Sequence, residues 1–396
     1  MKDKLKIVVY AIAHNEGKFI NRWMDSMKEA DAVVVLDTGS TDGTPDRLRA
    51  LGAIVEIRKY AKWNTVADYN RIQKARIGDL NAPIPWRFDW ARNDSIDLAK
   101  RVVPDADILV CTDPDEILLP GWRAKLEKAW LNSLAKGEQP TTAQYEYVWN
   151  FNADGSDGTK FWYEKIHTPN AGRWAHPVHE ILEYDGVRKH MIFVEGMRLE
   201  HHADPTKSRG QYLHLLELSV EECPNDDRNM HYLGREYKFY RRWDDCIKTL
   251  KRHLTLPSAQ WRAERAASMR FIAEAYGAKG DATQQEVWLR RAIMEEPTQR
   301  EAAMELAELM NDQKDWPGLV RACEACLAVK ERRLTYLTRP ECWGSRPHDL
   351  YSVGLWYTGY KRRAIEENEI AMKLSPNDQR LKDNDAIMRK LIGGAV

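Results

Sequence analysis

The first half of the chain alternates short apolar runs with segments of helical spacing, and this alternation is its most constraining feature. Lys6 to Ala13 is a nearly continuous β-branched run, Glu16 to Ala30 has helical spacing, and Ala32 to Leu36 is a second apolar run. Thr44 to Leu51 then suits a helix and Ala53 to Ile57 a third strand. Such a pattern is typical of a mainly parallel sheet with helices on both faces.

The next segments extend this α/β pattern. Lys59 to Arg87 has weak periodicity and two prolines, so we expect a partly helical excursion over the surface. Asp89 to Val102 predicts a helix, Ala106 to Cys111 a buried strand, and Pro120 to Ala135 another helix. Thr142 to Ala203 contains short alternating segments. There we expect antiparallel strands that complete the sheet.

The second half, after Ser208, has helical spacing almost throughout. An apolar residue followed by a small one, with a large residue three positions later, recurs four times, and the first three occurrences are 39 and 34 residues apart. The pairs are Leu233-Gly234, Ile272-Ala273, Leu306-Ala307 and Val353-Gly354. These segments resemble tetratricopeptide repeats from about Asp226 to Ser375, with an insertion at Arg332 to Pro347. We predict about four repeats, an α/β domain at residues 1–207 and a helical-repeat domain at residues 208–396.

Charge and apolar runs exclude some classes of protein. Lys plus Arg equals Asp plus Glu at 60 each, so no overall positive field attracts nucleic acid or an anionic membrane. No apolar run reaches the roughly 20 residues that cross a bilayer. Without a recognisable signal peptide we predict a cytoplasmic protein whose six cysteines stay reduced. Cys323 and Cys326 lack a second ligand pair for zinc, so we interpret them as packed helix residues.

An acidic cluster follows the strand that ends at Cys111. Asp113 and Asp115 are separated by one residue, and Glu116 comes next. In open α/β sheets, ligands bind at the carboxyl ends of the strands. Two carboxylates there can share a Mg²⁺ or Mn²⁺ ion, which prefers oxygen ligands, and leave positions for phosphate oxygens. The pattern therefore favours a metal-bound phosphorylated ligand.

Four polar segments occur in a specific order along the α/β half, and three of them are expected at strand ends. They are Ala13-His-Asn15-Glu16, Asp37-Thr-Gly-Ser-Thr-Asp42-Gly-Thr, Phe88-Asp-Trp-Ala-Arg92-Asn93 and Asp113-Pro-Asp-Glu116. In order and spacing they resemble the signature of family 2 glycosyltransferases of the GT-A fold. The resemblance covers approximately Leu5 to Asp204 and implies an inverting, hexosyltransferase-like enzyme.

The resemblance also implies roles for these residues. Nucleotide-binding residues would be Ala13, Asn15 and Glu16 in the pocket, Asp37 on the base, and Arg92 at the base or diphosphate. Asp115 would bind the metal, with Asp113 contacting the ribose or a metal-bound water. Simpler roles stay open: Asp37 and Asp42 as turn residues, Arg92 as an ion-pair partner and Glu116 as a helix-start carboxylate.

Two later motifs supply the remaining candidates. In enzymes of this family a histidine after the sheet often completes the metal site, and His201 and His202 are the candidates here. An inverting transfer also needs a base on the acceptor side. Glu180 is our candidate, with His179 to orient it. Asp154, Asp157 and Glu164 are alternatives to Glu180, and a structural salt bridge is an alternative role for it.

The leading hypothesis is a transferase that moves one sugar from a nucleotide sugar, most simply a UDP-sugar, to an acceptor positioned by the helical repeats. Repeat surfaces of this kind bind peptides or proteins, so we expect a polypeptide acceptor, with a cell-envelope glycan precursor as the alternative. A noncatalytic scaffold with a vestigial nucleotide-sugar domain is the competing hypothesis. A processive synthase is disfavoured because Asn170 stands where a Gln-x-x-Arg-Trp motif begins. A nucleotidyltransferase is disfavoured because the chain lacks the glycine-rich Gly-x-Gly-x-x-Arg loop expected after the first strand of that class.

Overall fold

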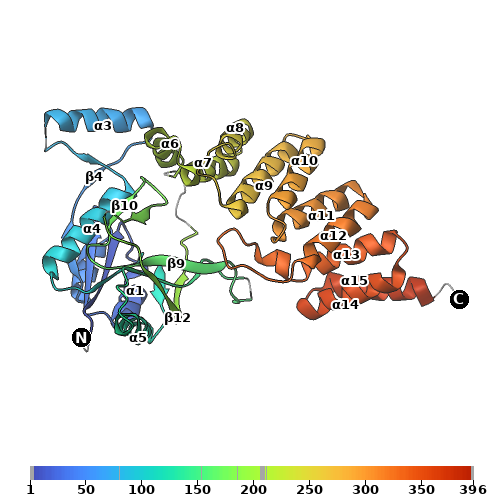
Figure 1. The fold of residues 1–396 in the computed structure, drawn as a ribbon, viewed down its shortest axis with the longest axis horizontal. Helices are drawn as coiled ribbons and strands as arrows, with labels where there is room; N and C mark the ends of the chain where they lie inside the picture. The colour runs from blue at the N-terminus through green and yellow to red at the C-terminus, as the bar shows by residue number, and fades with distance from the viewer. Residues whose placement is uncertain are drawn as a thin grey trace. The chain divides into compact units, whose positions relative to one another are not determined.

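The chain forms two compact units, Met1–Glu222 and Cys223–Val396 (Figure 1). The computed structural model describes residues 4–79, 81–152, 154–184, 186–205, 210 and 212–393. The first unit is α/β and the second is helical, as predicted. The division follows helix α6 (Tyr212–Glu222), whereas the boundary expected at residues 207 and 208 precedes that helix.

The first unit is built on a sheet that has, within the described residues, the strand order β3-β2-β1-β6-β9-β8-β12-β7. Its strands are β1 (Ile7–Ala13), β2 (Ala32–Asp37), β3 (Ile54–Ile57), β6 (Ile108–Cys111), β7 (Glu116–Leu118), β8 (Thr142–Val148), β9 (Lys160–His167) and β12 (Met191–His201). Strands β3, β2, β1 and β6 run parallel, which confirms the mainly parallel sheet. Strand β9 is antiparallel to β6 and β8, and β7 is antiparallel to β12.

The expectation of antiparallel strands between residues 142 and 203 is wrong for one pair, because β12 runs parallel to β8. After β9 the chain passes through β10 (Arg173–Ala175) and β11 (Ile181–Glu183), which pair with each other outside the main sheet. Because the chain makes this excursion before it re-enters the sheet, β12 runs in the same direction as β8. The register shifts between Phe193 and Arg198, and the φ of 71° at Gly196 within that shift is one that glycine adopts without strain.

Helices cover both faces of this sheet. They are α1 (Ile20–Met27), α2 (Thr44–Ala50), α4 (Phe88–Val102) and α5 (Trp122–Ala135). Alternate residues of a strand face opposite sides, so β1 contributes to two cores. Val9 shares one hydrophobic cluster with Trp23 of α1 and Trp122 of α5, whereas Val8 shares the other with Ile96 of α4. Both tryptophans are fully buried, and truncation of either to Ala costs about 3–5 kcal/mol.

The segment between the third strand and α4 forms a helical excursion, as expected. Helix α3 (Val66–Gly78) lies between β4 (Tyr60–Ala61) and β5 (Ile84–Pro85), and these two short strands pair with each other. The Thr65 side chain accepts a hydrogen bond from the backbone N–H of Asp68 and so begins the helix.

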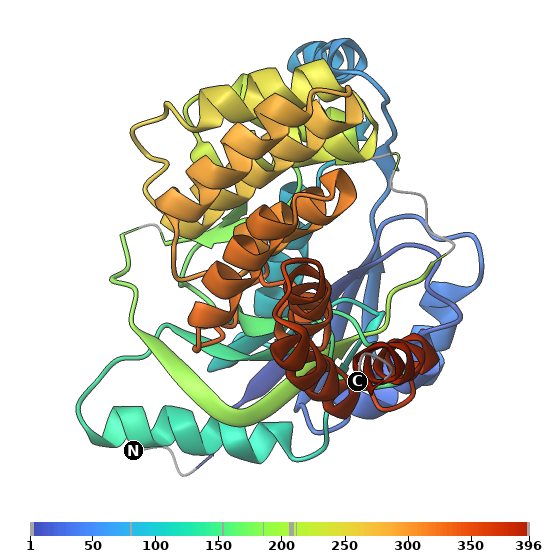
Figure 2. The ribbon, with the colours of Figure 1, turned by 90° about the vertical axis from the view of Figure 1, so that its right-hand side faces the viewer.

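The second unit consists of helix pairs that follow one another along the chain (Figure 2). Its helices are α7 (Asp227–Phe239), α8 (Trp243–His253), α9 (Arg262–Ala278), α10 (Ala282–Glu295), α11 (Glu301–Gln313), α12 (Trp316–Ala328), α13 (Arg346–Tyr357), α14 (Lys361–Leu374) and α15 (Gln379–Gly393). Within the described residues α7 to α14 make four successive pairs, in agreement with the predicted repeat number.

Small residues allow the helices of these pairs to approach closely. A Cβ at Gly234 would lie 2.3 Å from a methyl carbon of Leu250 on the partner helix α8. Ala273 and Ala307, the equivalent residues of the next pairs, are fully buried. The predicted insertion separates α12 from α13 and contains a short 3₁₀ helix, Pro340–Trp343. Cys323 is buried on α12, as its interpretation as a packing residue predicts.

Membrane insertion of a helix finds no support in the described part of the chain. No helix there is both long enough and apolar enough to cross a bilayer.

Candidate active site

The carboxyl ends of three parallel strands place the predicted motifs at one edge of the sheet. Strands β2, β1 and β6 are neighbours, and they end at Asp37, Ala13 and Cys111. The polar segments that follow them therefore lie next to one another. The sheet itself accounts for this arrangement, because the apolar runs that form parallel strands end immediately before the polar residues.

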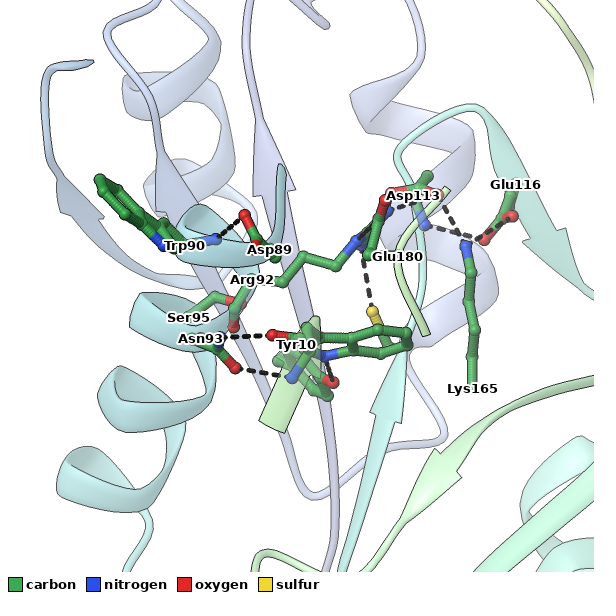
Figure 3. A network of polar contacts seen from close by, with 12 residues as sticks. Tyr10, Asp89, Trp90, Arg92, Asn93, Ser95, Asp113, Glu116, Lys165 and Glu180 are labelled. Carbon is green, nitrogen blue, oxygen red and sulfur yellow. Dashed lines mark hydrogen bonds and ion pairs between the residues drawn. The ribbon is translucent and has the colours of Figure 1, made fainter. Parts of the chain in front are cut away.

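Asp113 is held between two buried cations (Figure 3). Nη2 of Arg92, from α4, lies 2.9 Å from Oδ1 of Asp113, and Nζ of Lys165, from β9, lies 2.8 Å from Oδ2. Burial alone would raise the pKa of Asp113, but the charges of Arg92 and Lys165 hold it far below its usual range. Asp113 is therefore ionised, and both of its oxygens are engaged.

Glu116 is the second carboxylate around Lys165. Its Oε2 accepts a hydrogen bond of 2.8 Å from the backbone N–H of Asp113, and its Oε1 accepts one of 2.9 Å from the Tyr147 hydroxyl. Nζ of Lys165 lies 3.4 Å from Oε1. Burial raises the pKa of Glu116. Glu116 therefore fixes the turn that carries Asp113 and Asp115, which is a more specific role than a solvated helix-start carboxylate.

Arg92 joins the acidic turn to Glu180. Its Nε donates to Oε1 of Glu180, and its Nη1 lies 3.2 Å from the Cys111 sulfur. The guanidinium is buried and also lies over the Trp174 ring, 5.6 Å from the centroid. Burial would lower the pKa of Arg92, but Asp113, Cys111 and Glu180 raise it well above its usual value. Arg92 is thus a permanent cation within the cluster and not a surface ion-pair residue.

Glu180 bonds to Arg92, whereas the neighbouring His179 contacts a different residue, Tyr212. The His179 ring stacks on Tyr212 at a centroid distance of 5.9 Å, and its backbone φ is 52°. A positive φ at a non-glycine residue carries strain. The His176-Pro-Val-His179-Glu180 segment thus has an unusual backbone, since φ is 78° at His176 as well.

Asp115 lies beside His201, the last residue of β12. Nε2 of His201 is 3.6 Å from Oδ2 of Asp115, and Nδ1 is 3.0 Å from the Trp149 carbonyl oxygen. The imidazole stacks on the Trp149 ring at 4.6 Å. Burial would lower the pKa of His201, but the neighbouring Asp115 carboxylate raises it. The carbonyl fixes the ring so that Nε2 faces the carboxylate.

His202 points to other partners. Its Nε2 lies 3.3 Å from Oε2 of Glu200, and its ring stacks on Phe151 at 5.2 Å. Its backbone N–H donates to the Asp115 carbonyl oxygen at 2.9 Å. Of the two adjacent histidines, the structure brings the His201 imidazole to the Asp115 carboxylate and uses His202 to hold the Asp115 backbone.

The predicted nucleotide-binding residues shape two interlocking loops. The Asp37 Oδ1 accepts from the backbone N–H groups of Gly39 and Ser40, and Oδ2 accepts from the Ser40 hydroxyl at 2.6 Å. Oδ1 of Asn15 accepts from the backbone N–H of Thr41 at 2.7 Å, so Asn15 joins the loop after β1 to the loop after β2. The turn role considered for Asp37 is therefore realised in the structure.

The same loops are joined by further hydrogen bonds of their own polar groups. Ala13 ends β1 at 2% exposure, and the Glu16 backbone N–H donates to Oγ1 of Thr44 at 2.9 Å. Asp42 accepts from the backbone N–H of Gly17 at 2.9 Å. Burial would raise the pKa of Asp42, but its hydrogen bonds with Thr44 and Gly17 lower it. The conformation of these loops is therefore set by hydrogen bonds among their own polar groups.

Three site residues escaped the sequence interpretation. Lys165 lies inside β9, Tyr147 inside β8, and Cys111 ends β6. Lys165 is 5% exposed, and a lysine between Glu164 and Ile166 within a predicted strand is the only sequence signal that it offered. A buried lysine needs carboxylate partners, and Asp113 and Glu116 supply them.

Comparisons with known proteins place few constraints on the chain. No protein-family model matches it, and a search of curated proteins found no match. Among solved structures, MamA matches with 15% identity and a TM-score of 0.33, covering 42% of this chain and 83% of MamA. PilF from Pseudomonas aeruginosa matches with 10% identity and a TM-score of 0.35, covering 43% and 71%.

A third solved structure is TTC0263 from Thermus thermophilus, described as a thermophilic TPR protein. It matches with 16% identity and a TM-score of 0.31, covering 44% of this chain and 88% of its own. These TM-scores are low, so the description of the second unit as a series of helix pairs depends on its own contacts.

Proposed function

We propose that the chain is a metal-dependent, inverting glycosyltransferase of the family 2 type, which moves one sugar from a UDP-sugar or a related nucleotide sugar. One observation carries the proposal. At the carboxyl end of β6, Asp113 and Asp115 meet Arg92, Lys165, Glu180 and His201, so metal-binding, phosphate-binding and basic groups occur together. The parallel β3-β2-β1-β6 block with its antiparallel additions is the sheet expected for this fold.

Asp115 and His201 fit a divalent cation. Mg²⁺ and Mn²⁺ take carboxylate oxygens, and Mn²⁺ also accepts imidazole. Ligands bound at about 2.0–2.2 Å lie roughly 3–4 Å apart, and the Asp115 Oδ2 to His201 Nε2 distance is 3.6 Å. Ligating histidines generally give their other ring N–H to a carbonyl or carboxylate, as His201 does with Trp149. When bound, the ion would offset negative charge on the departing diphosphate.

Two cationic side chains of the protein would also offset the negative charge of the diphosphate. A nucleotide sugar carries about two negative charges on its diphosphate, and Arg92 and Lys165 are positive and buried beside the acidic turn. Preorganised charges in a site of low dielectric stabilise developing charge without reorganisation. Their pairing with Asp113 and Glu180 keeps them in place before a donor binds.

Glu180 is the base that we assign to the acceptor. In an inverting transfer the acceptor's nucleophilic atom bonds to the anomeric carbon while the bond from that carbon to the diphosphate oxygen breaks. The acceptor's proton then goes to the Glu180 carboxylate. Arg92 fixes the orientation of this carboxylate through Oε1. The acceptor that we propose is a polypeptide, with an envelope glycan precursor as the alternative.

The noncatalytic scaffold is the second candidate, and two observations favour it. The second unit is a series of helix pairs of the kind that binds other proteins. The Asp37 carboxylate, which the resemblance assigns to the base, is satisfied by its own loop. On this reading the charged cluster of the first unit would stabilise the fold and bind no nucleotide.

Hydrolysis of the sugar donor by the full chain distinguishes the glycosyltransferase from the noncatalytic scaffold. A panel of nucleotide sugars should show hydrolysis that requires Mn²⁺ or Mg²⁺ and falls about 100-fold in Asp115→Asn and His201→Gln. His202→Gln is the matched control and should stay within about threefold, since His202 bonds Glu200 instead. If no nucleotide binds the folded chain, the scaffold is correct. If Asp115→Asn keeps full metal-dependent turnover, the metal assignment is wrong.

The assignment of Glu180 has its own test. Glu180→Gln should keep UDP binding but lose about 10²–10⁴-fold in sugar transfer, because an amide cannot accept the acceptor's proton. Glu183→Gln on β11 is the control, since that carboxylate is exposed. Loss of UDP binding together with transfer in Glu180→Gln would assign Glu180 a structural role with Arg92.

A further inference from the structure

Two histidines and a glutamate meet in the core of the second unit, away from the charged cluster of the first. His231 lies on α7, His253 ends α8, and Glu264 lies in the first turn of α9. His231 and His253 are fully buried and Glu264 is 4% exposed. One ligand atom of each residue lies within 4.8 Å of the other two. The three helices that supply them contact one another.

The polar atoms of this cluster are only partly satisfied. Nδ1 of His231 and Nδ1 of His253 both bond the Ser268 hydroxyl, at 2.7 and 3.0 Å. Among the residues that the structure describes, neither Nε2 atom has a hydrogen bond, although both are buried. Nε2 of His253 lies 3.5 Å from Oε1 of Glu264, whose Oε2 accepts from the Tyr336 hydroxyl at 2.7 Å. Buried polar atoms without partners are costly and call for an explanation.

We propose that His231, His253 and Glu264 bind a divalent transition-metal ion of the zinc class. Two imidazoles and one carboxylate are a common ligand set for Zn²⁺. Ligand atoms on one zinc ion lie roughly 3.3 Å apart, since each bond is about 2.0–2.2 Å long. The His253–Glu264 pair is close to that separation, and the cluster needs to contract by at most roughly 1.5 Å to complete it.

The charge states of the cluster suit a cation. Burial lowers the pKa of His231 to about 3, so this ring is neutral, as a metal ligand must be. Burial would raise the pKa of Glu264, but its contacts with His253 and the Tyr336 hydroxyl lower it to about 2. Glu264 thus places a buried carboxylate charge beside the two rings, and such a charge attracts a cation.

Ser268 makes the proton balance explicit. A single hydroxyl can donate to only one of the two Nδ1 atoms, so in the metal-free protein one ring accepts from Ser268 and carries its own proton on Nε2. With a metal on both rings, each Nδ1 carries a proton and donates to the Ser268 oxygen, which accepts twice. Binding therefore releases no proton from the rings: the ring that carried its proton on Nε2 carries it on Nδ1 instead, and the Ser268 hydroxyl hydrogen turns away from both rings.

The site would be structural. It joins the first helix pair, α7 and α8, to α9 of the second pair through residues from all three helices. Each helix pair of a repeat protein buries its apolar face mainly against its neighbours. A metal that links the first pair to the next would stabilise that contact.

Zinc content and cobalt spectra of the full chain test the proposal. After chelation, desalting and reloading with Zn²⁺, the Asp115→Asn variant should retain about one zinc per chain, because that background removes the site proposed for the first unit. Adding His253→Gln to this background should remove the bound zinc. Adding His348→Gln, a histidine of α13 bonded to Glu367, should retain it. Co²⁺ should give the visible bands of a low-coordinate nitrogen–oxygen site without the near-ultraviolet absorption of cysteine ligands.

Ser268→Ala keeps all three ligands, so it provides a second test of the zinc site if the His253→Gln variant does not fold. It should weaken zinc binding about 10–100-fold, the usual effect of removing a partner that orients ligating histidines. The proposal is wrong if the folded Asp115→Asn chain retains no zinc, if His253→Gln binds zinc as well as the His348→Gln control, or if Ser268→Ala leaves the affinity unchanged. Cobalt spectra dominated by thiolate bands would also overturn it, and would place the ion on the cysteines.

Discussion

Arg92 organises the candidate active site at the scale of single residues. A buried guanidinium is tolerated only when its charge and its donors are matched, and here one side chain meets Asp113, Glu180 and Cys111. The planar fork lets Arg92 bond two carboxylates in different directions at once, which an ammonium group does less well. The acidic turn after β6 and the Glu180 segment are therefore joined through one residue of α4.

Arg92→Lys should destabilise the protein although it keeps the charge. The shorter, single-nitrogen head cannot reach both Asp113 and Glu180, so we expect a loss of about 1–3 kcal/mol in the free energy of unfolding and a large loss of transfer activity. Denaturant unfolding measures the first quantity. Arg101→Lys on the same helix is the control, because Arg101 is exposed and its ion pair with Glu56 contributes little. Equal effects of the two changes would contradict a central role for Arg92.

His167 gives the first unit a dependence on pH. Its Nδ1–H donates to the Thr168 carbonyl at 2.8 Å, and its Nε2 accepts from the Tyr10 hydroxyl at 2.7 Å, which in turn accepts from the Trp174 indole. This arrangement needs a neutral ring. Burial lowers the pKa of His167 from 6.5 to about 4 in the folded protein.

The sign of the pH effect follows from that shift. Between pH 6.5 and 4 the unfolded chain binds a proton at His167 that the folded chain does not, so stability is full above pH 6.5 and falls as the pH drops. At pH 5 the expected loss from this residue is about 2 kcal/mol. Unfolding of the wild type and His167→Gln at pH 7 and pH 5 isolates the effect, because the variant should lose less on acidification. An equal acid loss in both would show that the ring is protonated at little cost.

Sequence predicted the residues at strand ends better than those inside strands. Asp113 and Asp115 follow an apolar run that must be a central strand, so their place at the sheet edge follows from local pattern alone. Lys165 lies in the middle of β9, and only the pairing of β9 with β6 brings it to Asp113. The preference for His201 over His202 likewise depends on the pairing of β12 with β7, which local sequence does not encode.

At the scale of elements, the periodicities that predicted strands and helices are those that bury apolar surface. The β1, β2, β3 and β6 strands and helix α3 follow from them, as do the helix pairs of the second unit. The direction of β12 does not follow, because it is set by the path through β10 and β11 and not by the pattern within β12. The close packing of glycine residues within the helix pairs can be tested directly by substitution.

Gly234→Ala should destabilise the second unit despite the higher helix propensity of alanine. The added methyl group would overlap two side-chain carbons of Leu250, which is fully buried. Overpacking typically costs 1–3 kcal/mol, and the gain in propensity is about 1 kcal/mol, so we expect a net loss of about 1–2 kcal/mol. Gly354→Ala is the matched control, since its nearest contacts would be 3.1 Å away. Thermal unfolding of both variants measures the difference, and a stabilised Gly234→Ala would mean that α7 and α8 separate easily.

At the scale of the whole molecule, two kinds of architecture occur in one chain, each with its own buried clusters. One hydrophobic cluster lies on each face of the first unit's sheet, and a smaller one of Ala263, Ala267 and Leu337 lies in the second unit. This division was predictable because the hydrophobic period changes along the sequence. The position of the boundary relative to α6 was not, since a helix that packs on an α/β unit has the same pattern as one that begins a repeat array.

Hydrogen exchange of the full chain distinguishes an enzyme from a scaffold. With UDP and Mn²⁺ at 100 times their dissociation constant, ligand binding stabilises the bound unit by about 2.7 kcal/mol, so amides that exchange by opening of that unit slow by up to about 100-fold. We expect this slowing in the loops after β1, β2 and β6 and at the end of β12, and not in Asp115→Asn. Peptides from residues 223–393 provide the internal reference, because their helices have a separate core. Unchanged exchange in all four segments at saturating nucleotide would mean that the charged cluster serves only to hold the sheet edge together, since no ligand can bind a folded unit selectively without stabilising it.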